Sequence, residues 1–377
     1  MRTILIYLAL VLSLAPALAQ NTRSIPLTPA AWDFGDAEAE FVTHLGQKAL
    51  RIDDRGGEAT NRKLLSVKDL KFSNGTIEYD ITFRENTGFA AVHFRRKDAK
   101  NSEHFYIRRF WAKDPQINTA VQYAAVLKGV NLWDVSEAYQ SNATLKETDW
   151  NHVKLVVRDQ QLLVYVNDME TPTLYVPMMD GDWASGALAF DGSAYLANVK
   201  VTPDATPGLS AGAGYDPVHN DPRYLREWEV SDIQDFPQGK EPTLDDLPGE
   251  NTKWRTVSAS HHGLVNLSRI YGGGTRVDRR IVWLKTTLSV SRDMVRKLNF
   301  GFSDEAYVYL NGAPLFVGKN LYGTPAALAP RGRASLENAS FELPLKEGEN
   351  EVMIGLTNFF FGWGLVARLA DSEGVRY

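Results

Sequence analysis

The sequence of 377 residues contains no cysteine. This absence excludes disulfides, thiol nucleophiles, zinc sites built from thiolates and a lipid-modified N-terminal cysteine. Long apolar runs are also absent after the N-terminus, and the run from Ile4 to Leu14 is too short to span a membrane. The chain must therefore hold its structure through packed cores, without covalent cross-links.

An excess of positive charge is absent as well. The net charge is −5 and the calculated pI is about 5.9, so no basic field attracts nucleic acid or an anionic membrane surface. The sequence has no Gly-x-Ser-x-Gly, His-Glu-x-x-His or P-loop motif, which removes the usual markers of serine hydrolases, zinc proteases and nucleotide-dependent enzymes. A neutral or weakly charged partner fits this composition better.

Residues 1–19 have the pattern of a secretory signal peptide. Arg2 precedes the apolar run, and Ala17-Leu18-Ala19 forms an A-x-A cleavage site. We therefore expect the mature protein to begin near Gln20 and to be exported to the periplasm or the extracellular space. Export without disulfides suggests a bacterial protein.

Beyond this segment, composition and patterning favour β-structure. The 29 glycines, 17 prolines and 11% aromatic residues are typical of strands joined by many turns, and the chain is long enough for about two domains. We predict an all-β fold of two antiparallel β-sandwich (jelly-roll) domains. The clearest predicted strands are 75–83, 88–95, 104–110, 121–127, 152–159, 161–166 and 186–191 in the first half, and 254–260, 263–269, 280–290, 297–302, 306–310, 339–345, 350–357 and 364–369 in the second.

A segment rich in Pro, Gly, Ala and Asp separates the two halves. Residues 203–226 show no apolar period, which is typical of a linker. We therefore assign residues 24–202 to the first sandwich and residues 227–377 to the second.

Seven segments of the first domain share a common strand pattern. They are GTIEYDITF at 75–83, FAAVHFR at 89–95, EHFYIR at 103–108, VQYAAVLKG at 121–129, WNHVKLVV at 150–157, LLVYVNDMETPTL at 162–174 and GALAF at 186–190. Together they resemble the concanavalin A-like lectin/glucanase jelly roll, and in particular exported laminin-G-like domains. The similarity covers most of residues 30–202 and implies a sugar-related fold without naming a ligand.

Three segments of the second domain carry another pattern. They are LNFGFSDEAYVYLNGAPLFVG at 298–318, FELPLKEGENEVMIGLTN at 341–358 and FGWGLVARL at 361–369. These segments are similar to the galactose-binding-like jelly roll, a module often appended to glycoside hydrolases and other exported carbohydrate-active proteins. Because many such modules bind no sugar, the resemblance indicates the fold rather than the ligand.

Polar and aromatic side chains are concentrated between residues 93 and 133. Sugar recognition uses flat aromatic surfaces, with Arg, Gln and His side chains bonding the hydroxyls. Alternation along a strand places His93 and Arg95 on one face. It likewise places His104, Tyr106 and Arg108 on one face of the next strand. The predicted ligand-binding residues are His93, Arg95, His104, Tyr106, Arg108, Gln122, Tyr123 and Trp133. The alternative is a structural network of arginine–carboxylate pairs.

Three carboxylates are weaker candidates for catalysis, namely Glu78, Asp80 and Glu103. Glu78 and Asp80 lie two apart on a predicted strand and face one side, and glycoside hydrolysis needs paired carboxylates. Glucanases of the resembled family carry Glu-x-Asp and a further Glu on one strand, whereas Phe83 and Arg84 follow here. This departure favours binding over hydrolysis.

Metal sites have little support in the sequence. Adjacent residues on a strand point in opposite directions, so His261 and His262 should not chelate one metal. Asp180-Gly181-Asp182 and Asp304-Glu305 could place oxygens near Ca²⁺, but no complete ligand loop is present. Gly272-Gly273-Gly274 is followed neither by Lys-Ser/Thr nor by a predicted helix, so it is not a phosphate-binding loop. We therefore predict no cofactor, with Ca²⁺ left open.

The aromatic run at residues 358–363 predicts an exposed platform formed by Phe360 and Trp363, because exposed aromatic loops bind ligands or partners. Three functions remain open. The first is an exported carbohydrate-binding or accessory carbohydrate-active protein. The second is a glycoside hydrolase or lyase that uses carboxylates of the first sandwich. The third is a structural or adhesion module that binds a protein partner through this run.

Overall fold

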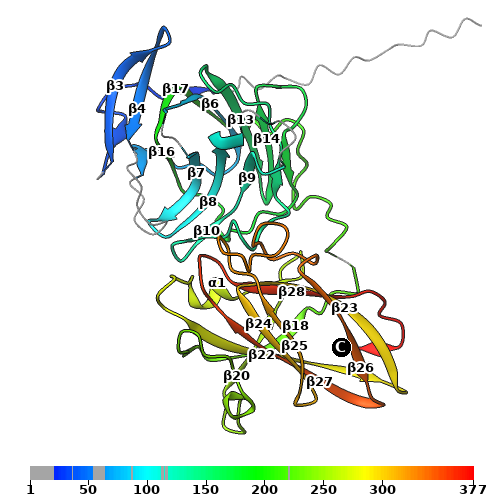
Figure 1. Cartoon of the computed structure of the whole chain (residues 1–377). Helices are drawn as coiled ribbons and strands as arrows, with labels where there is room; N and C mark the ends of the chain where they lie inside the picture. Colours follow the sequence, from blue (N-terminus) through cyan, green and yellow to red (C-terminus); the bar gives the residue numbers. More distant parts are fainter. Residues whose placement is uncertain are drawn as a thin grey trace, which may run out of the picture.

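The computed structural model describes residues 21–35, 37–53, 64–85, 88–111, 114, 118–219 and 221–377. The predicted signal segment lies outside these residues. The all-β prediction is confirmed, because two antiparallel sandwiches account for most of the described chain (Figure 1). Within the described ranges no helix is long and apolar enough to cross a membrane.

The first sandwich is built from two antiparallel sheets. The strand order is β15-β14-β13-β6-β17-β4-β3 in one sheet, with β1 paired to β17, and β11-β10-β8-β7-β16-β5-β2 in the other, with β9 paired to β8 and β12. The first sheet contains β1 (Arg23–Ser24), β3 (Glu38–His44), β4 (Gln47–Asp53), β6 (Gly75–Phe83), β13 (Asn151–Arg158), β14 (Gln161–Val166), β15 (Leu174–Val176) and β17 (Ala194–Pro203). The second contains β2 (Trp32–Asp33), β5 (Leu65–Val67), β7 (Phe89–Asp98), β8 (Asn101–Arg108), β9 (Val121–Tyr123), β10 (Val126–Leu127), β11 (Val130–Asn131), β12 (Gln140–Ser141) and β16 (Ala187–Gly192).

Apolar side chains from alternate positions of both sheets fill the space between them. Val92 and Phe94 of β7 and Phe105 and Ile107 of β8 are fully buried in this core. Because side chains alternate along a strand, the residues between them point to the outer face of the second sheet. The fold therefore separates this stretch of the chain into a core side and an outer side.

The second sandwich also consists of two antiparallel sheets. The strand order is β20-β18-β22-β27-β24-β25 in the larger sheet, with β19 and β29 paired to β22, and β21-β28-β23-β26 in the smaller one. The larger sheet contains β18 (Glu227–Ser231), β19 (Gln234–Asp235), β20 (Trp254–Ser258), β22 (Arg280–Val290), β24 (Glu305–Leu310), β25 (Ala313–Lys319), β27 (Gly348–Thr357) and β29 (Val375–Arg376). The smaller contains β21 (Leu264–Asn266), β23 (Met294–Ser303), β26 (Ala339–Leu345) and β28 (Gly364–Leu369).

Two predicted strands end earlier than expected. The strand predicted at 263–269 gives way to the short helix α1 (Leu267–Tyr271), because the side chain of Asn266 accepts a hydrogen bond from Arg269 N and caps the helix. The strand predicted at 104–110 ends at Arg108, which pairs with Phe89 at the start of β7. It continues as the 3₁₀ turn η2 (Arg109–Trp111), and a second such turn, η3 (Leu244–Asp246), lies in the second sandwich.

The segment that joins the sandwiches is packed against the first of them. Leu209 contacts Leu163 and Tyr165 on the outer side of the first sheet. Arg158 donates a hydrogen bond to the Leu209 carbonyl at 2.9 Å, and Gln161 donates to the carbonyl of Ser210 at 2.8 Å. These contacts fix part of the linker on the first sandwich.

Loops of the second sandwich lie against the outer face of the β7–β8–β9 region, and Figure 1 shows orange loops of the lower domain reaching the upper one. The Trp133 ring centroid is 4.6 Å from that of Tyr322 and 5.9 Å from that of Phe361. The backbone N–H of Gly362 donates to the two carboxylate oxygens of Asp134 at 3.2 and 3.1 Å. The interface thus combines aromatic packing with a buried backbone–carboxylate contact.

We expect Asp134→Ala to lower the stability of this interface by about 1–3 kcal/mol, because the buried N–H of Gly362 loses its acceptor. Asp134→Asn keeps a carbonyl oxygen and should lose less. Thermal unfolding combined with limited proteolysis of residues 203–226 measures the effect. Wild-type stability and wild-type proteolysis of the alanine variant would contradict the prediction.

Candidate functional site

The outward side chains of β7, β8, β9 and β16 form a row that we call the polar face. His93 lies directly opposite His104, and Tyr106 lies opposite Gln122 in the strand register. Ala91, the next outward residue of β7, lies opposite Tyr106 on one side and Asp191 on the other. The members of the polar face are His93, His104, Tyr106, Arg108, Gln122 and Asp191, all of which are buried.

One end of the polar face is a histidine pair with ring centroids 4.4 Å apart. His93 Nδ1 lies 2.9 Å from Ser102 Oγ, and its Nε2 lies 3.3 Å from Asp191 Oδ2. Ser, His and Asp are the residue types of a catalytic triad, but Ser102 is only 3% exposed. A substrate carbonyl therefore has no access to this hydroxyl, and the arrangement orients His93 instead.

Asp191 and Ser102 were not among the residues predicted to lie beside His93. Asp191 lies on β16, which is far along the chain but pairs with β7. The signal that could have found it is the alternation in GALAFD, since Leu188 and Phe190 point into the core. Only the strand order, which the sequence does not state, places this carboxylate beside the histidines.

The other end of the polar face is organised around Arg108. Its Nη2 donates to the Tyr106 hydroxyl at 2.8 Å and to Gln122 Oε1 at 2.5 Å, and its Nη1 donates to the carbonyl of Thr119. Gln122 Nε2 in turn donates to the Trp133 carbonyl at 2.9 Å. Among the described residues, these bonds use three of the five guanidinium donors, and Arg108 is 7% exposed.

Aromatic side chains from both sandwiches surround this end, and we call them the aromatic rim. The Phe89 ring lies 6.0 Å from that of Tyr106 and is 42% exposed, and Phe110, which lies against Gly88, is 68% exposed. From the second sandwich, Tyr322 is 38% exposed and stacks with Phe360 at 5.9 Å. The rim consists of Phe89, Phe110, Trp133, Tyr322 and Phe360.

Trp363 is not part of the rim. The prediction of an exposed platform is wrong at this residue, because Trp363 is fully buried in the core of the second sandwich and its Nε1 donates to the Gly272 carbonyl at 2.9 Å. Phe360, the other predicted member, is half-buried and lies in the rim.

Two of the predicted ligand-binding residues, Arg95 and Tyr123, lie on the core side of the sheet, and the prediction that Arg95 shares a face with His93 is wrong. Alternation along β9 turns Tyr123 inward. Arg95 has a φ of +46° where the β7–β8 register shifts, so it departs from strand alternation. Its guanidinium donates to the carbonyls of Ser73 and Asp159, at 2.8 and 2.6 Å, in turns of the opposite sheet.

Glu103 is fully buried on the same inner side. Burial raises its pKa to about 7, against the opposing effects of the hydrogen bond from the Tyr123 hydroxyl, at 2.6 Å, and of the Arg95 charge. A raised pKa is typical of an acid catalyst. However, Glu103 has no exposed surface through which a glycosidic bond could reach it, so its environment is that of a structural carboxylate.

Glu78 and Asp80 share the outer side of β6, opposite to the core residue Tyr79. Asp80 accepts hydrogen bonds from His152 Nδ1 and from Asn198, each at 2.6 Å, and Glu78 lies 3.7 Å from His152 Nε2. Burial opposes ionisation of Asp80, but these hydrogen bonds outweigh it and lower its pKa. Asp80 is therefore ionised and does not meet the requirement for a general acid.

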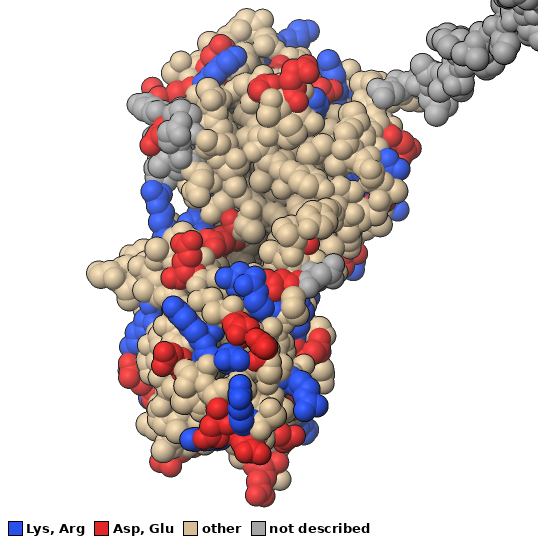
Figure 2. Space-filling view, turned by 90° about the vertical axis from the view of Figure 1, so that its right-hand side faces the viewer, with Lys and Arg blue, Asp and Glu red and all other residues tan. Residues whose placement is uncertain are grey.

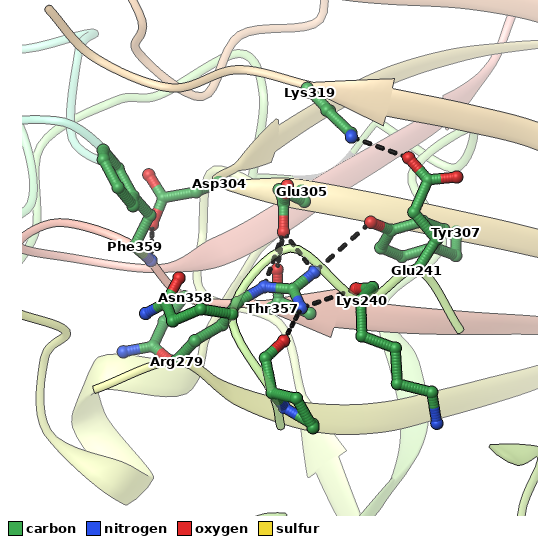
Figure 3. Close-up of polar contacts among 12 residues, drawn as sticks. Lys240, Glu241, Arg279, Asp304, Glu305, Tyr307, Lys319, Thr357, Asn358 and Phe359 are labelled. Carbon is green, nitrogen blue, oxygen red and sulfur yellow. Dashed lines mark hydrogen bonds and ion pairs between the residues drawn. The ribbon is translucent and has the colours of Figure 1, made fainter. Parts of the chain in front are cut away.

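The acidic residues considered for Ca²⁺ accept hydrogen bonds from the protein. Asp180 Oδ2 accepts from Ser136 Oγ at 3.0 Å, and Asp182 pairs with Arg269. Asp304 accepts hydrogen bonds from two backbone amides of the loop after β27, one of which is drawn in Figure 3. These contacts orient the carboxylates toward protein donors.

A second buried arginine, Arg279, contrasts with Arg108 (Figure 3). It donates two hydrogen bonds to Glu305 Oε2 at 2.9 and 2.6 Å. Two more go to the carbonyls of Pro237 and Lys240, both at 2.6 Å, and a fifth goes to the Tyr307 hydroxyl at 3.4 Å. All five donors are used, so this ion pair fixes a loop and offers nothing to a ligand.

His261 and His262 lie in the turn between β20 and β21 rather than on a strand. Their ring centroids are only 4.0 Å apart. The prediction that they point in opposite directions is therefore wrong, because alternation applies to extended strands and not to turns.

The comparisons with known proteins assign no family. No protein-family model matches the chain, and no curated protein matches it. Among solved structures, the carbohydrate-binding module CBM66 from Bacillus subtilis is 19% identical, with a TM-score of 0.33, and the match covers 46% of this chain and 96% of the module. A protein of unknown function with a galectin-like fold from Bacillus subtilis is 13% identical, with a TM-score of 0.35 and coverages of 47% and 91%. Bacillus licheniformis β-glucanase is 10% identical, with a TM-score of 0.33 and coverages of 48% and 97%. These low scores define no ligand for this chain.

Glu103 generates a prediction for stability and pH. The pKa of Glu103 is about 7 in the folded chain, against an ordinary value of 4.5. Between pH 4.5 and pH 7 the carboxyl group is therefore protonated in the folded state and ionised in the unfolded state. The stability contributed by Glu103 therefore falls as the pH rises from about 4.5 to 7. Because glutamine does not titrate, we expect the stability of Glu103→Gln relative to the wild type to be greater at pH 8 than at pH 5, by up to about 3 kcal/mol.

Denaturant unfolding at both pH values measures this difference, with Glu342→Gln on the exposed side of β26 as the control. An equal stability difference at the two pH values for Glu103→Gln would show that Glu103 titrates normally.

Proposed function

We propose that this chain is an exported carbohydrate-binding protein that holds a glycan at the Arg108 end of the polar face, within the aromatic rim. The observation that carries the proposal is the combination of an arginine with two remaining donors and aromatic rings contributed by both sandwiches. Sugars present hydroxyl groups at their edges and apolar patches on their faces, so they are recognised by this pairing of side chains.

The arrangement of the face supports a neutral, hydroxyl-rich ligand. Arg108, Tyr106 and Gln122 are linked to one another by hydrogen bonds, so their orientations are fixed before a ligand arrives. Asp191, the carboxylate of the polar face, contacts His93 at the other end of the face. A preorganised donor set with exposed rings beside it binds without a large conformational cost.

Surface charge supports the same class of partner. On the view in Figure 2, Lys and Arg side chains are interspersed with Asp and Glu side chains. Together with the net charge of −5, this gives no extended basic surface for nucleic acid on that face. The N-terminal signal pattern predicts export to the periplasm or the extracellular space. Polysaccharides and glycoconjugates are available there as ligands.

Binding has better support than hydrolysis. A retaining glycosidase needs two accessible carboxyl groups about 5–5.5 Å apart, one of them protonated. Here Glu103 is sealed in the core, and Asp80 is held ionised by His152 and Asn198. We therefore propose a binding or accessory role and not a hydrolase or lyase.

Two substitutions test the proposed site from its two sides. We expect Arg108→Ala to weaken glycan binding at least about tenfold, because a charge-assisted hydrogen bond is lost. Tyr322→Ala, on the second sandwich, should weaken binding about three- to tenfold through the loss of a stacking surface. A glycan array with the full chain identifies the ligand, and calorimetry measures the affinities.

Arg158→Ala is the matched control, since Arg158 is a half-buried, hydrogen-bonded arginine on the opposite sheet. It should bind like the wild type. If the wild type binds a glycan and neither Arg108→Ala nor Tyr322→Ala changes the affinity, the site lies elsewhere. Absence of binding across a broad array would refute the proposed function.

A further inference from the structure

Three potential metal ligands meet where the linker contacts both sandwiches. Asp216 belongs to the linker, and His261 and His262 belong to a turn of the second sandwich. One ligand atom from each lies within 4.8 Å of the other two. Asp216 Oδ2 and His262 Nδ1 are 3.4 Å apart, and neither Asp216 Oδ2 nor His262 Nε2 has a hydrogen-bond partner although both are buried.

The spacing matches a tetrahedral metal site. Nitrogen and oxygen ligands lie about 2.0–2.1 Å from a tetrahedral Zn²⁺, so two of them are about 3.3 Å apart. The distance between Asp216 Oδ2 and His262 Nδ1 is close to this value. The remaining ligand atom lies within 4.8 Å of the other two, so it must move by at most about 1.5 Å to complete the same geometry.

Other contacts already orient the ligands. Asp216 Oδ1 accepts a hydrogen bond from Val218 N at 2.8 Å, which turns Oδ2 toward His262. The Tyr139 hydroxyl lies 2.6 Å from His261 Nε2 and donates to the Met178 carbonyl at 2.9 Å. Because that carbonyl can only accept, the hydroxyl oxygen accepts from Nε2–H, and Nδ1 of His261 keeps its lone pair. Such supporting hydrogen bonds are typical around metal ligands.

The charges around the cluster are mixed. Arg226, which donates to the His261 carbonyl at 3.3 Å, opposes a cation, whereas the carboxylates of Asp216 and Asp180 favour one. Burial lowers the pKa of His261 and of His262. His219 lies in the same turn as Asp216 and is exposed, which makes it a candidate for a fourth ligand.

We propose that Asp216, His261 and His262 bind a divalent transition metal of the Zn²⁺ type at the junction of the linker and the two sandwiches. Two imidazoles and one carboxylate suit Zn²⁺ and exclude Ca²⁺ or Mg²⁺ as the preferred ion, since those ions take oxygen ligands. The site would cross-link the linker to the second sandwich beside Tyr139 of the first. It is separate from the proposed glycan site and needs no sugar.

The full chain, freed of metal with a chelator and titrated with Zn²⁺ alone, tests this proposal. We expect one equivalent to bind, a rise in the unfolding temperature, and visible absorption typical of tetrahedral coordination when Co²⁺ replaces Zn²⁺. His262→Ala and the nearly isosteric Asp216→Asn should each lower the affinity at least about tenfold. Asp216→Asn keeps the acceptor for Val218 N, so it separates loss of a ligand from loss of the turn.

His152→Ala and His104→Ala are the matched controls and should keep the stoichiometry and affinity. The second is needed because His93, His104 and Asp191 also bring potential ligand atoms within 4.8 Å. Absence of stoichiometric Zn²⁺ binding by the wild type would overturn the proposal. Binding that survives in His262→Ala and Asp216→Asn but is lost in His104→Ala would overturn it as well and would place the metal on the polar face.

Discussion

Carboxylates from both sandwiches bind the backbone of the loop at residues 358–363. The position of one sandwich on the other depends on this loop. Asp304 of the second sandwich accepts hydrogen bonds from the amides of Phe359 and Phe360, while Asp134 of the first accepts from Gly362. A Cβ on Gly362 would lie only 2.7 Å from an oxygen of Asp134, so this approach requires glycine. Burial raises the pKa of both carboxyl groups, that of Asp304 to about 7. The aromatic rim is thus positioned by backbone hydrogen bonds rather than by packing alone.

Strand periodicity was sufficient to predict the fold class and most strands, because alternating burial requires apolar and polar residues to alternate along the sequence. The grouping of His104, Tyr106 and Arg108 followed from the same rule. The rule failed at Arg95, where a left-handed backbone conformation departs from alternation, and at His261 and His262, which lie in a turn. Strand order places Asp191 at the site, and the packing of the two sandwiches places Tyr322 there. Neither strand order nor domain packing can be predicted from a short segment of the sequence.

The two buried arginines show why burial alone does not identify a binding residue. Arg279 and Arg108 are almost equally buried, at 8% and 7% exposure. The first satisfies all its donors within one sandwich, whereas the second satisfies only part of them and lies where two sandwiches meet. A count of hydrogen-bond donors therefore separates the structural ion pair of Arg279 from the partly satisfied Arg108, and no residue-type pattern makes that distinction.

The hydrophobic core of the first sandwich does not stop at its own chain segment. Leu264 and Ala334, both from the second half of the sequence, are buried in the same cluster as Val130 and Val135. Gly273 also approaches Val130 so closely that a Cβ would lie 2.5 Å from its side chain. Because residues of the second half complete the core of the first sandwich, we expect the two sandwiches to unfold together. Cleavage of the linker would not release two independent domains. Exchange of either half during evolution would have to preserve the contacts between the two sandwiches.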